Sequence, residues 1–119
     1  MKESYQQQRK EHLIFRALQN IFLLKIKNVH PKFRNINITI SNIEASKKVS
    51  YVKVFISVNP ESFQKEIIDE LNKNKSMIRG YLGNSLKDQL RIIPDIRFYL
   101  DERAMAVRRI EELLKDEVL

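Results

Sequence analysis

The chain has no cysteine, no tryptophan, two glycines and three prolines in 119 residues. Without cysteine it has no disulfide scaffold, no thiolate nucleophile and no thiolate zinc site. The scarcity of glycine and proline argues against collagen-like or low-complexity sequence, and 43% hydrophobic residues are too many for intrinsic disorder. Apolar runs such as Ile21–Leu24 are far too short to span a membrane, and the polar segment Met1–Lys10 has no signal-peptide pattern. We therefore expect a soluble, cytoplasmic protein that forms one domain over residues 1–119.

Positive charge is in excess and unevenly distributed. The formal net charge is +7, to which residues 1–34 contribute +6, 35–70 contribute −1, 71–94 contribute +4 and 95–119 contribute −2. The two basic blocks form one patch only if the fold brings them together. A positive surplus indicates a polyanionic partner, most commonly nucleic acid, although charge also keeps a small domain in solution.

Residues 4–27 have the apolar spacing of a largely buried helix, which Pro31 prevents from continuing. The expected apolar positions are Leu13, Ile14, Phe15, Ala17, Leu18, Ile21, Phe22, Leu24 and Ile26. On the opposite side, Arg9, Arg16 and Lys27 project within about 20° of one another at helical geometry. This basic ridge is either an ordinary solvated face or a surface for a polyanion.

Three stretches alternate apolar and polar residues and predict β-strands. The first covers residues 35–41, and Ile43 is out of phase with it, which predicts a bulge or the strand's end near Asn42. The second covers residues 51–58 and follows a short polar turn, so the two predict an antiparallel hairpin. The third covers residues 96–100.

Two more helical stretches complete the chain. Residues 61–90 carry two apolar stripes, and the segment 72–76 between them has no apolar residue, which predicts a break or kink. Residues 102–117 are helical again. Their apolar positions include Met105, Ile110, Leu113 and Leu114. The order of helix, two strands, two helices, strand and helix predicts one α+β domain with a three-stranded sheet.

No pattern for catalysis or metal binding is present. The chain has no nucleotide-cradling glycine motif and no nucleophile elbow. His12 and His30 have no obvious carboxylate partner at metal-ligand spacing. We therefore expect neither an enzyme nor a cofactor.

The segment Gly80-Tyr81-Leu82-Gly83 has the form G-x-x-G, with which KH domains clamp a nucleic-acid backbone. It lies inside an apolar helical stripe, which favours two helix-interior glycines that allow close packing. A KH-like turn fits better at the polar break.

Three cations at this break, Lys73, Lys75 and Arg79, are candidate contacts for RNA. Four acidic residues precede them, so acids come early and bases late: Glu61, Glu66, Asp69 and Glu70. Complementing the helix dipole explains the same order without any partner. Both explanations remain open.

The proline-centred stretch Leu90–Asp101, followed by Arg109–Leu114, resembles the ribosome-binding factor A family. Met77–Gly83 is similar to the family's second central helix, and Tyr51–Val58 to its second strand. The resemblance covers nearly the whole chain. It implies a type II KH-like fold, α-β-β-α-kink-α-β followed by a C-terminal helix, with a three-stranded mixed sheet. The order read from periodicity agrees with this fold.

Two departures from the family pattern are visible. The family carries Ala-x-Gly at the kink between the central helices, where this chain reads Asn74-Lys75-Ser76. It also tends to have Ser and Gly in the last helix, at positions occupied here by Arg103 and Val107. We expect a different kink geometry and a more regular last helix.

The resemblance implies a bacterial, non-enzymatic assembly factor that binds the small ribosomal subunit and its rRNA late in maturation. It also implies a role in maturing the rRNA 5′ end, cold adaptation and release by a maturation GTPase. We expect a monomer without cofactor, metal or membrane partner. The predicted RNA-binding residues are Arg9, Arg16, Lys27, Lys73, Lys75 and Arg79. The alternatives are another ribosome-associated factor, an enzyme, or a DNA-binding helix-turn-helix protein, which would poorly accommodate the strands.

Overall fold

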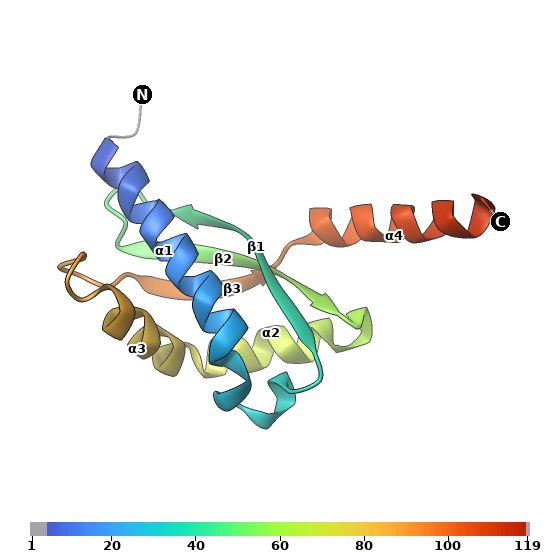
Figure 1. The fold of residues 1–119 in the computed structure, drawn as a ribbon, viewed down its shortest axis with the longest axis horizontal. Helices are drawn as coiled ribbons and strands as arrows, with labels where there is room; N and C mark the ends of the chain where they lie inside the picture. Colours follow the sequence, from blue (N-terminus) through green and yellow to red (C-terminus); the bar gives the residue numbers. More distant parts are fainter. Residues whose placement is uncertain (1–4, 119) are drawn as a thin grey trace.

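The computed structural model describes residues 5–118, apart from the side chains at 104–105 and 116–118. The elements, in chain order, are α1 (Tyr5–Leu24), the short 3-10 helices η1 (Ile26–Asn28) and η2 (Pro31–Phe33), β1 (Asn37–Ala45), β2 (Tyr51–Asn59), η3 (Glu61–Phe63), α2 (Gln64–Lys73), α3 (Lys75–Leu86), β3 (Asp95–Leu100) and α4 (Glu102–Val118) (Figure 1). This order confirms the predicted α+β arrangement. Ser4, expected to open the first helix, and the side chain of Met105 lie outside the described residues.

The sheet has the order β1-β2-β3 and is mixed, as predicted: β1 and β2 are antiparallel, and β2 and β3 are parallel. A parallel pair needs a long crossover connection, which α2 and α3 supply. The register of the hairpin shifts between Ile40 and Asn42, where the bulge was predicted. The extra residue, Ser41, donates a hydrogen bond of 3.2 Å from its hydroxyl to the Phe55 carbonyl oxygen.

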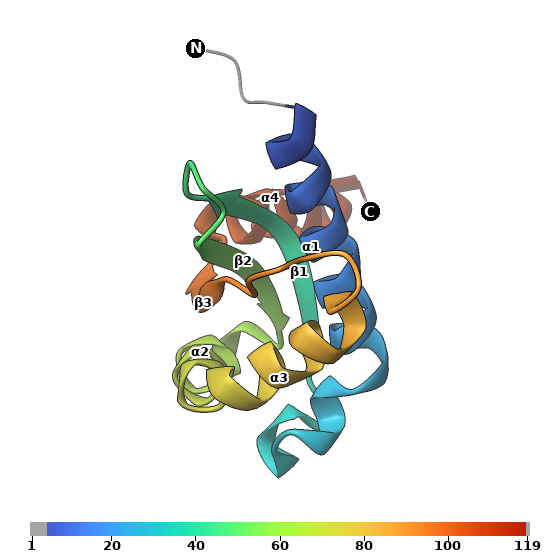
Figure 2. The same cartoon turned by 90° about the vertical axis from the view of Figure 1, so that its left-hand side faces the viewer.

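Helices α1, α2 and α3 cover one face of the sheet and enclose the hydrophobic core (Figure 2). Alternation along β2 sends every second side chain to this face. The fully buried strand residues are Val52, Val54, Ile56 and Val58 from β2 and Ile96 and Phe98 from β3. The helices meet them with Ile14 and Leu18 of α1, Ile67 and Leu71 of α2, and Ile78 and Leu82 of α3. The other face of β2 carries Tyr51, Lys53 and Phe55.

Helix α1 ends three residues before the predicted end. Its last backbone hydrogen bond runs from Lys25 N–H to the Ile21 carbonyl oxygen at 2.8 Å, and Lys25 then leaves the helical conformation. The prediction that Leu24 belongs to the buried stripe is wrong, since it is 71% exposed. The change of direction in η1 buries Ile26 in its place.

The predicted break in the long helical stretch is confirmed, and it occupies the single residue Asn74. The Asn74 N–H closes α2 by donating to the carbonyl oxygens of Glu70 and Leu71, at 3.1 and 3.2 Å. The Asn74 carbonyl oxygen opens α3 by accepting from the N–H groups of Met77 and Ile78. One residue therefore ends one helix and begins the next.

Helix α4 extends away from the body of the protein (Figure 1). It is one continuous helix. An ion pair of 2.8 Å between Arg109 Nη2 and Glu61 Oε1 ties it to the segment before α2. Among the described residues, no helix is both long enough and apolar enough to cross a membrane.

Candidate nucleic-acid interface

The cations predicted to contact RNA are all exposed, but the fold distributes them over separate places. Arg9 and Arg16 lie two turns apart on α1. Lys73 is the last residue of α2 and Lys75 the first residue of α3, so the two flank Asn74.

Lys27 lies in η1 and not on α1, so the prediction that it projects beside Arg9 and Arg16 is wrong. Its predicted direction assumed a helix that continued to residue 27, whereas α1 ends at Leu24. Lys27 instead lines a groove beside β1 together with Leu23 and Ile38.

The two basic blocks of the sequence do meet, because α1 packs against α3. At the end of α1, Lys25 Nζ lies 5.3 Å from the centre of the Tyr81 ring on α3, a cation–π contact. Lys25 was not among the predicted RNA contacts. Helical periodicity could not identify it, since it is the residue at which the helix ends.

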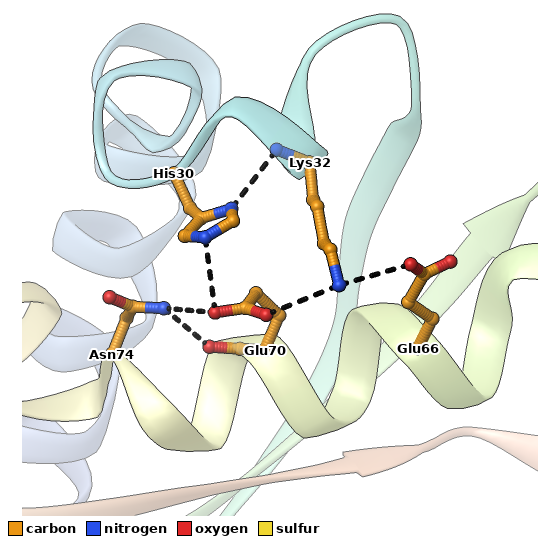
Figure 3. Close-up of polar contacts among 5 residues, drawn as sticks. All are labelled: His30, Lys32, Glu66, Glu70 and Asn74. Atoms are coloured by element: carbon orange, nitrogen blue, oxygen red, sulfur yellow. Dashed lines mark hydrogen bonds and ion pairs between the residues drawn. The ribbon is translucent and has the colours of Figure 1, made fainter.

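The break between α2 and α3 is held by a buried carboxylate (Figure 3). Glu70 is only 9% exposed, and a buried charge is tolerated only when it is paired and hydrogen-bonded. Asn74 Nδ2 donates to Glu70 Oε2 at 3.0 Å and to the Glu70 carbonyl oxygen at 2.8 Å. His30 Nε2 lies 3.4 Å from Glu70 Oε2, and Lys32 Nζ lies 3.7 Å from Glu70 Oε1. The side chain of Asn74 thereby fixes the kink.

Folding gives His30 a carboxylate partner that spacing in the sequence does not reveal. The partner, Glu70, is distant in sequence and becomes a neighbour only through folding. His30 Nδ1 accepts a hydrogen bond of 3.1 Å from Lys32 N–H, which leaves Nε2 to carry the proton that faces Glu70. Among the described residues, no three carboxylates or histidines converge as a metal site.

Lys32 belongs to the first basic block, but its charge is used inside the protein. Its Nζ lies 3.1 Å from Glu66 Oε1. The hydrogen bond that Lys32 donates to Glu66 is the main reason why the pKa of Lys32 is raised above its usual value, and the negative charge of Glu66 adds to it. Lys32 is therefore less available to an outside partner than Lys73 and Lys75, the two lysines at the kink.

The N-terminus of α3 distinguishes the two explanations for the kink cations, which are contact with RNA and complementing the helix dipole. Lys73 lies in the last turn of α2, where a cation complements the helix dipole. Lys75 lies at the first position of α3, the positive end of its dipole, and the first turn of α3 has no acidic residue. The dipole therefore disfavours a lysine there. The Asn74 carbonyl oxygen takes up the N–H groups of Met77 and Ile78, which leaves those of Lys75 and Ser76 without a backbone acceptor in the described part of the chain. The helix dipole and these two N–H groups together favour an anion.

The kink is also anchored to the sheet. Asn72 Nδ2 donates to the Phe98 carbonyl oxygen at 3.0 Å, and its Oδ1 accepts from Phe98 N–H at 2.8 Å. This paired amide contact holds the end of α2 on the edge strand β3. Lys73 and Lys75 are thus presented from a rigid support.

Arg79 has a structural role that the sequence did not reveal. Its Nη2 donates to the Ile93 carbonyl oxygen at 2.7 Å, and its Nε donates to the Pro94 carbonyl oxygen at 3.0 Å. Its Nε also lies 3.6 Å from Asp95 Oδ1. The guanidinium thus ties α3 to the segment that enters β3, and only its remaining exposed part can face an anion.

The two glycines of the G-x-x-G segment lie inside α3, as predicted, and not in a turn. The expectation that both allow close packing is wrong for Gly80, because a Cβ there would have no neighbour within 4 Å. A Cβ at Gly83 would lie at an ordinary 3.5 Å from Ile93 Cγ1. The G-x-x-G segment therefore offers no turn to a nucleic-acid backbone, and the kink remains the candidate anion site.

The structure resembles solved members of one family. The crystal structure of ribosome-binding factor A from Thermus thermophilus matches with a TM-score of 0.60 and 18% identity, over 78% of this chain and 92% of that chain. A model of the Thermus thermophilus protein fitted into a map of its complex with the 30S subunit matches with a TM-score of 0.56 and 19% identity, over 83% of this chain and 93% of that chain. These matches support the predicted KH-like fold.

The sequence matches the same family. A relative from Cytophaga hutchinsonii, a ribosome-binding factor A, is 30% identical over 112 residues, which are 94% of this chain and 82% of the relative. The relative of that name from Christiangramia forsetii is 33% identical over 78 residues, and this match spans 66% of this chain and 60% of the relative. The family profile described as ribosome-binding factor A matches residues 6–114. With the predicted fold in place and the profile matching almost every described residue, the chain belongs to the ribosome-binding factor A family.

Proposed function

We propose that this protein binds the small ribosomal subunit during maturation by gripping the backbone of its rRNA at the kink between α2 and α3. Family membership supports this, as does the fitted Thermus thermophilus relative, which is described in complex with the 30S subunit. Lys73 and Lys75 make the central contacts in this proposal. Arg9 and Arg16 extend the surface along α1, and the exposed part of Arg79 borders it. Lys27 contributes at most one phosphate contact, from the groove beside β1.

The observation that carries the proposal is the position of Lys75. A lysine at the positive end of α3 is unfavourable in the isolated protein and favourable once a phosphate occupies the first turn. The network around Glu70 and the Asn72 contact with β3 hold this turn in place before binding. Rigid cations and free N–H groups are suited to phosphate, which the protein contacts without reading base sequence.

The finer role follows from the family and from the chemistry of such a surface. The protein holds one conformation of the rRNA late in assembly and thereby supports maturation of the rRNA 5′ end, above all in the cold. It acts in the cytoplasm as a monomer, performs no catalysis itself, and leaves when a maturation GTPase changes the subunit. Shape and phosphate contacts are sufficient for this work.

The test compares two double variants in co-sedimentation with purified immature small subunits, with mature 70S ribosomes as the reference. Lys73→Glu with Lys75→Glu places negative charge against phosphate, and we expect binding about tenfold weaker or worse. The matched control, Gly80→Ala with Gly83→Ala, alters the literal G-x-x-G segment in space that accepts a methyl group, and we expect unchanged binding. Loss of binding in the alanine pair and retention in the glutamate pair would place the functional loop at Gly80–Gly83 instead.

A further inference from the structure

The face of the sheet opposite α1, α2 and α3 has the composition of a surface for nucleic acid. Alternation brings Tyr51, Lys53 and Phe55 of β2 to this face, and Arg97 and Tyr99 of β3 join them. The core-facing residues between them are buried, whereas the three aromatic residues are half-buried and the two cations exposed. Aromatic residues interleaved with cations on an open sheet are typical of surfaces that bind unpaired RNA.

The three aromatic side chains form a continuous strip across the two strands. The hydroxyl groups of Tyr51 and Tyr99 lie 3.1 Å apart, within hydrogen-bond distance. The rings of Phe55 and Tyr99 have their centres 5.8 Å apart, with 32° between their planes. Tyr51 and Phe55 are four positions apart along the strand, about 13 Å, which is room for two or three bases.

The two cations oppose each other within this strip. Lys53 and Arg97 are register partners in the parallel pair of β2 and β3. Like charges directly opposite on one face destabilise a sheet. In the described part of the chain neither forms an ion pair, even though Glu44 of β1 is the register partner of Lys53 on its other side. Lys53 Nζ instead lies 5.7 Å from the centre of the Tyr99 ring. An anion placed between the two cations would relieve their repulsion.

The two ends of the aromatic strip differ in the charge that surrounds them. Lys47 and Lys48 lie in the turn that precedes Tyr51. Asp95, the register partner of Tyr51, is at the same end, and its carboxylate lies 3.6 Å from Arg79 Nε. The acids Asp101 and Glu102 lie at the opposite end, next to Phe55. A polyanion on this face is therefore favoured at the end near the turn and disfavoured at the start of α4.

We propose that this face binds a short unpaired segment of RNA, with a phosphate between Lys53 and Arg97 and bases stacked on Tyr99 and its neighbours Tyr51 and Phe55. The site lies on the other side of the sheet from the core-covering helices and their kink. The inference rests on the proposed function only in taking RNA as the partner. The protein then contacts two RNA segments at once, one through helix N–H groups and lysines and one through stacking, so that it clamps them in a fixed relation.

The test uses an oligouridylate of about eight nucleotides and records the ring-proton NMR signals of the tyrosines and phenylalanines in the intact protein. We expect the signals of Tyr51, Phe55 and Tyr99 to shift. Tyr99→Leu, which keeps an apolar side chain over the sheet, should weaken binding roughly five- to a hundredfold, the range for loss of one stacked base. Lys53→Gln with Arg97→Gln changes only exposed side chains and should weaken it while the fold, checked by the core methyl signals, is kept.

Two comparisons decide against other occupants and separate this site from the kink. A duplex RNA of the same length and a polyglutamate peptide should leave the three ring signals unmoved. The variant Lys73→Glu with Lys75→Glu should retain the ring shifts even if it loses the small subunit. Unmoved rings with oligouridylate would overturn the inference, as would equal shifts with duplex or polyglutamate. Either result leaves binding at the kink standing.

Discussion

Helices α1 and α4 open and close the described chain, and both have an apolar side, but only α1 buries it. Ile14 and Leu18 of α1 are fully buried against the sheet and α3. In α4, Ile110 is 57% exposed and Leu113 is 64% exposed. An amphipathic pattern thus predicts that a helix forms and does not predict what it packs on. The difference lies in the connections: α1 lies across the sheet, whereas α4 leaves directly from the end of β3 and extends away from the body (Figure 1).

A pair of matched substitutions tests this comparison and has the largest expected effect. Leu18→Ala removes a fully buried side chain from the core, and we expect a loss of about 2–5 kcal/mol in the free energy of unfolding. Leu113→Ala makes the same change at an exposed site, and we expect a difference of no more than about 0.5 kcal/mol. Urea denaturation measures both. A large loss in the α4 variant would show that its apolar side is covered in solution.

Much of the fold could be predicted because periodicity acts within each element. The alternation of β2, the bulge between Ile40 and Asn42 and the break at Asn74 depend on neighbouring residues, and all three are found where the sequence placed them. The end of α1 was misplaced because Lys25 and Leu24 are both compatible with a helix. Tertiary packing, which buries Ile26 through η1, determines that end.

The candidate site was harder to predict because it depends on contacts between distant segments. The exposure of Lys73 and Lys75 followed from their polar neighbours. The tie from Arg79 to the carbonyl groups before β3, the pairing of His30 with Glu70 and the opposition of Lys53 and Arg97 did not. Each of these contacts joins residues from different elements, so no pattern of neighbouring residues in the sequence predicts it.

The cations of α3 show a similar contrast, between a side chain that is bonded within the protein and one that is not. Arg79→Gln removes charge-assisted hydrogen bonds to two carbonyl groups at a half-exposed position, and we expect a loss of about 1 kcal/mol in unfolding free energy. Lys75→Gln removes a charge that the helix dipole disfavours, so we expect no loss of stability. Subunit binding should respond in the opposite order, with Lys75→Gln the weaker binder. Equal stability losses would mean that Lys75 also serves the fold.

The smallest effect on stability is expected on the exposed side of α1, where the comparison with the core is sharpest. Arg9→Gln with Arg16→Gln should change the free energy of unfolding by no more than about 0.5 kcal/mol, because both side chains lie in solvent opposite the buried stripe. If each contacts one phosphate of single-stranded rRNA, the slope of log K against log salt should become shallower by about 1.4 in total. Lys27→Gln is the matched control, since η1 directs this lysine to a separate groove. It should reduce the slope by no more than about 0.7, the value for one phosphate. An unchanged slope in the double variant would confine the phosphate contacts to the kink, and the exposed arginines of α1 would then be an ordinary solvated face.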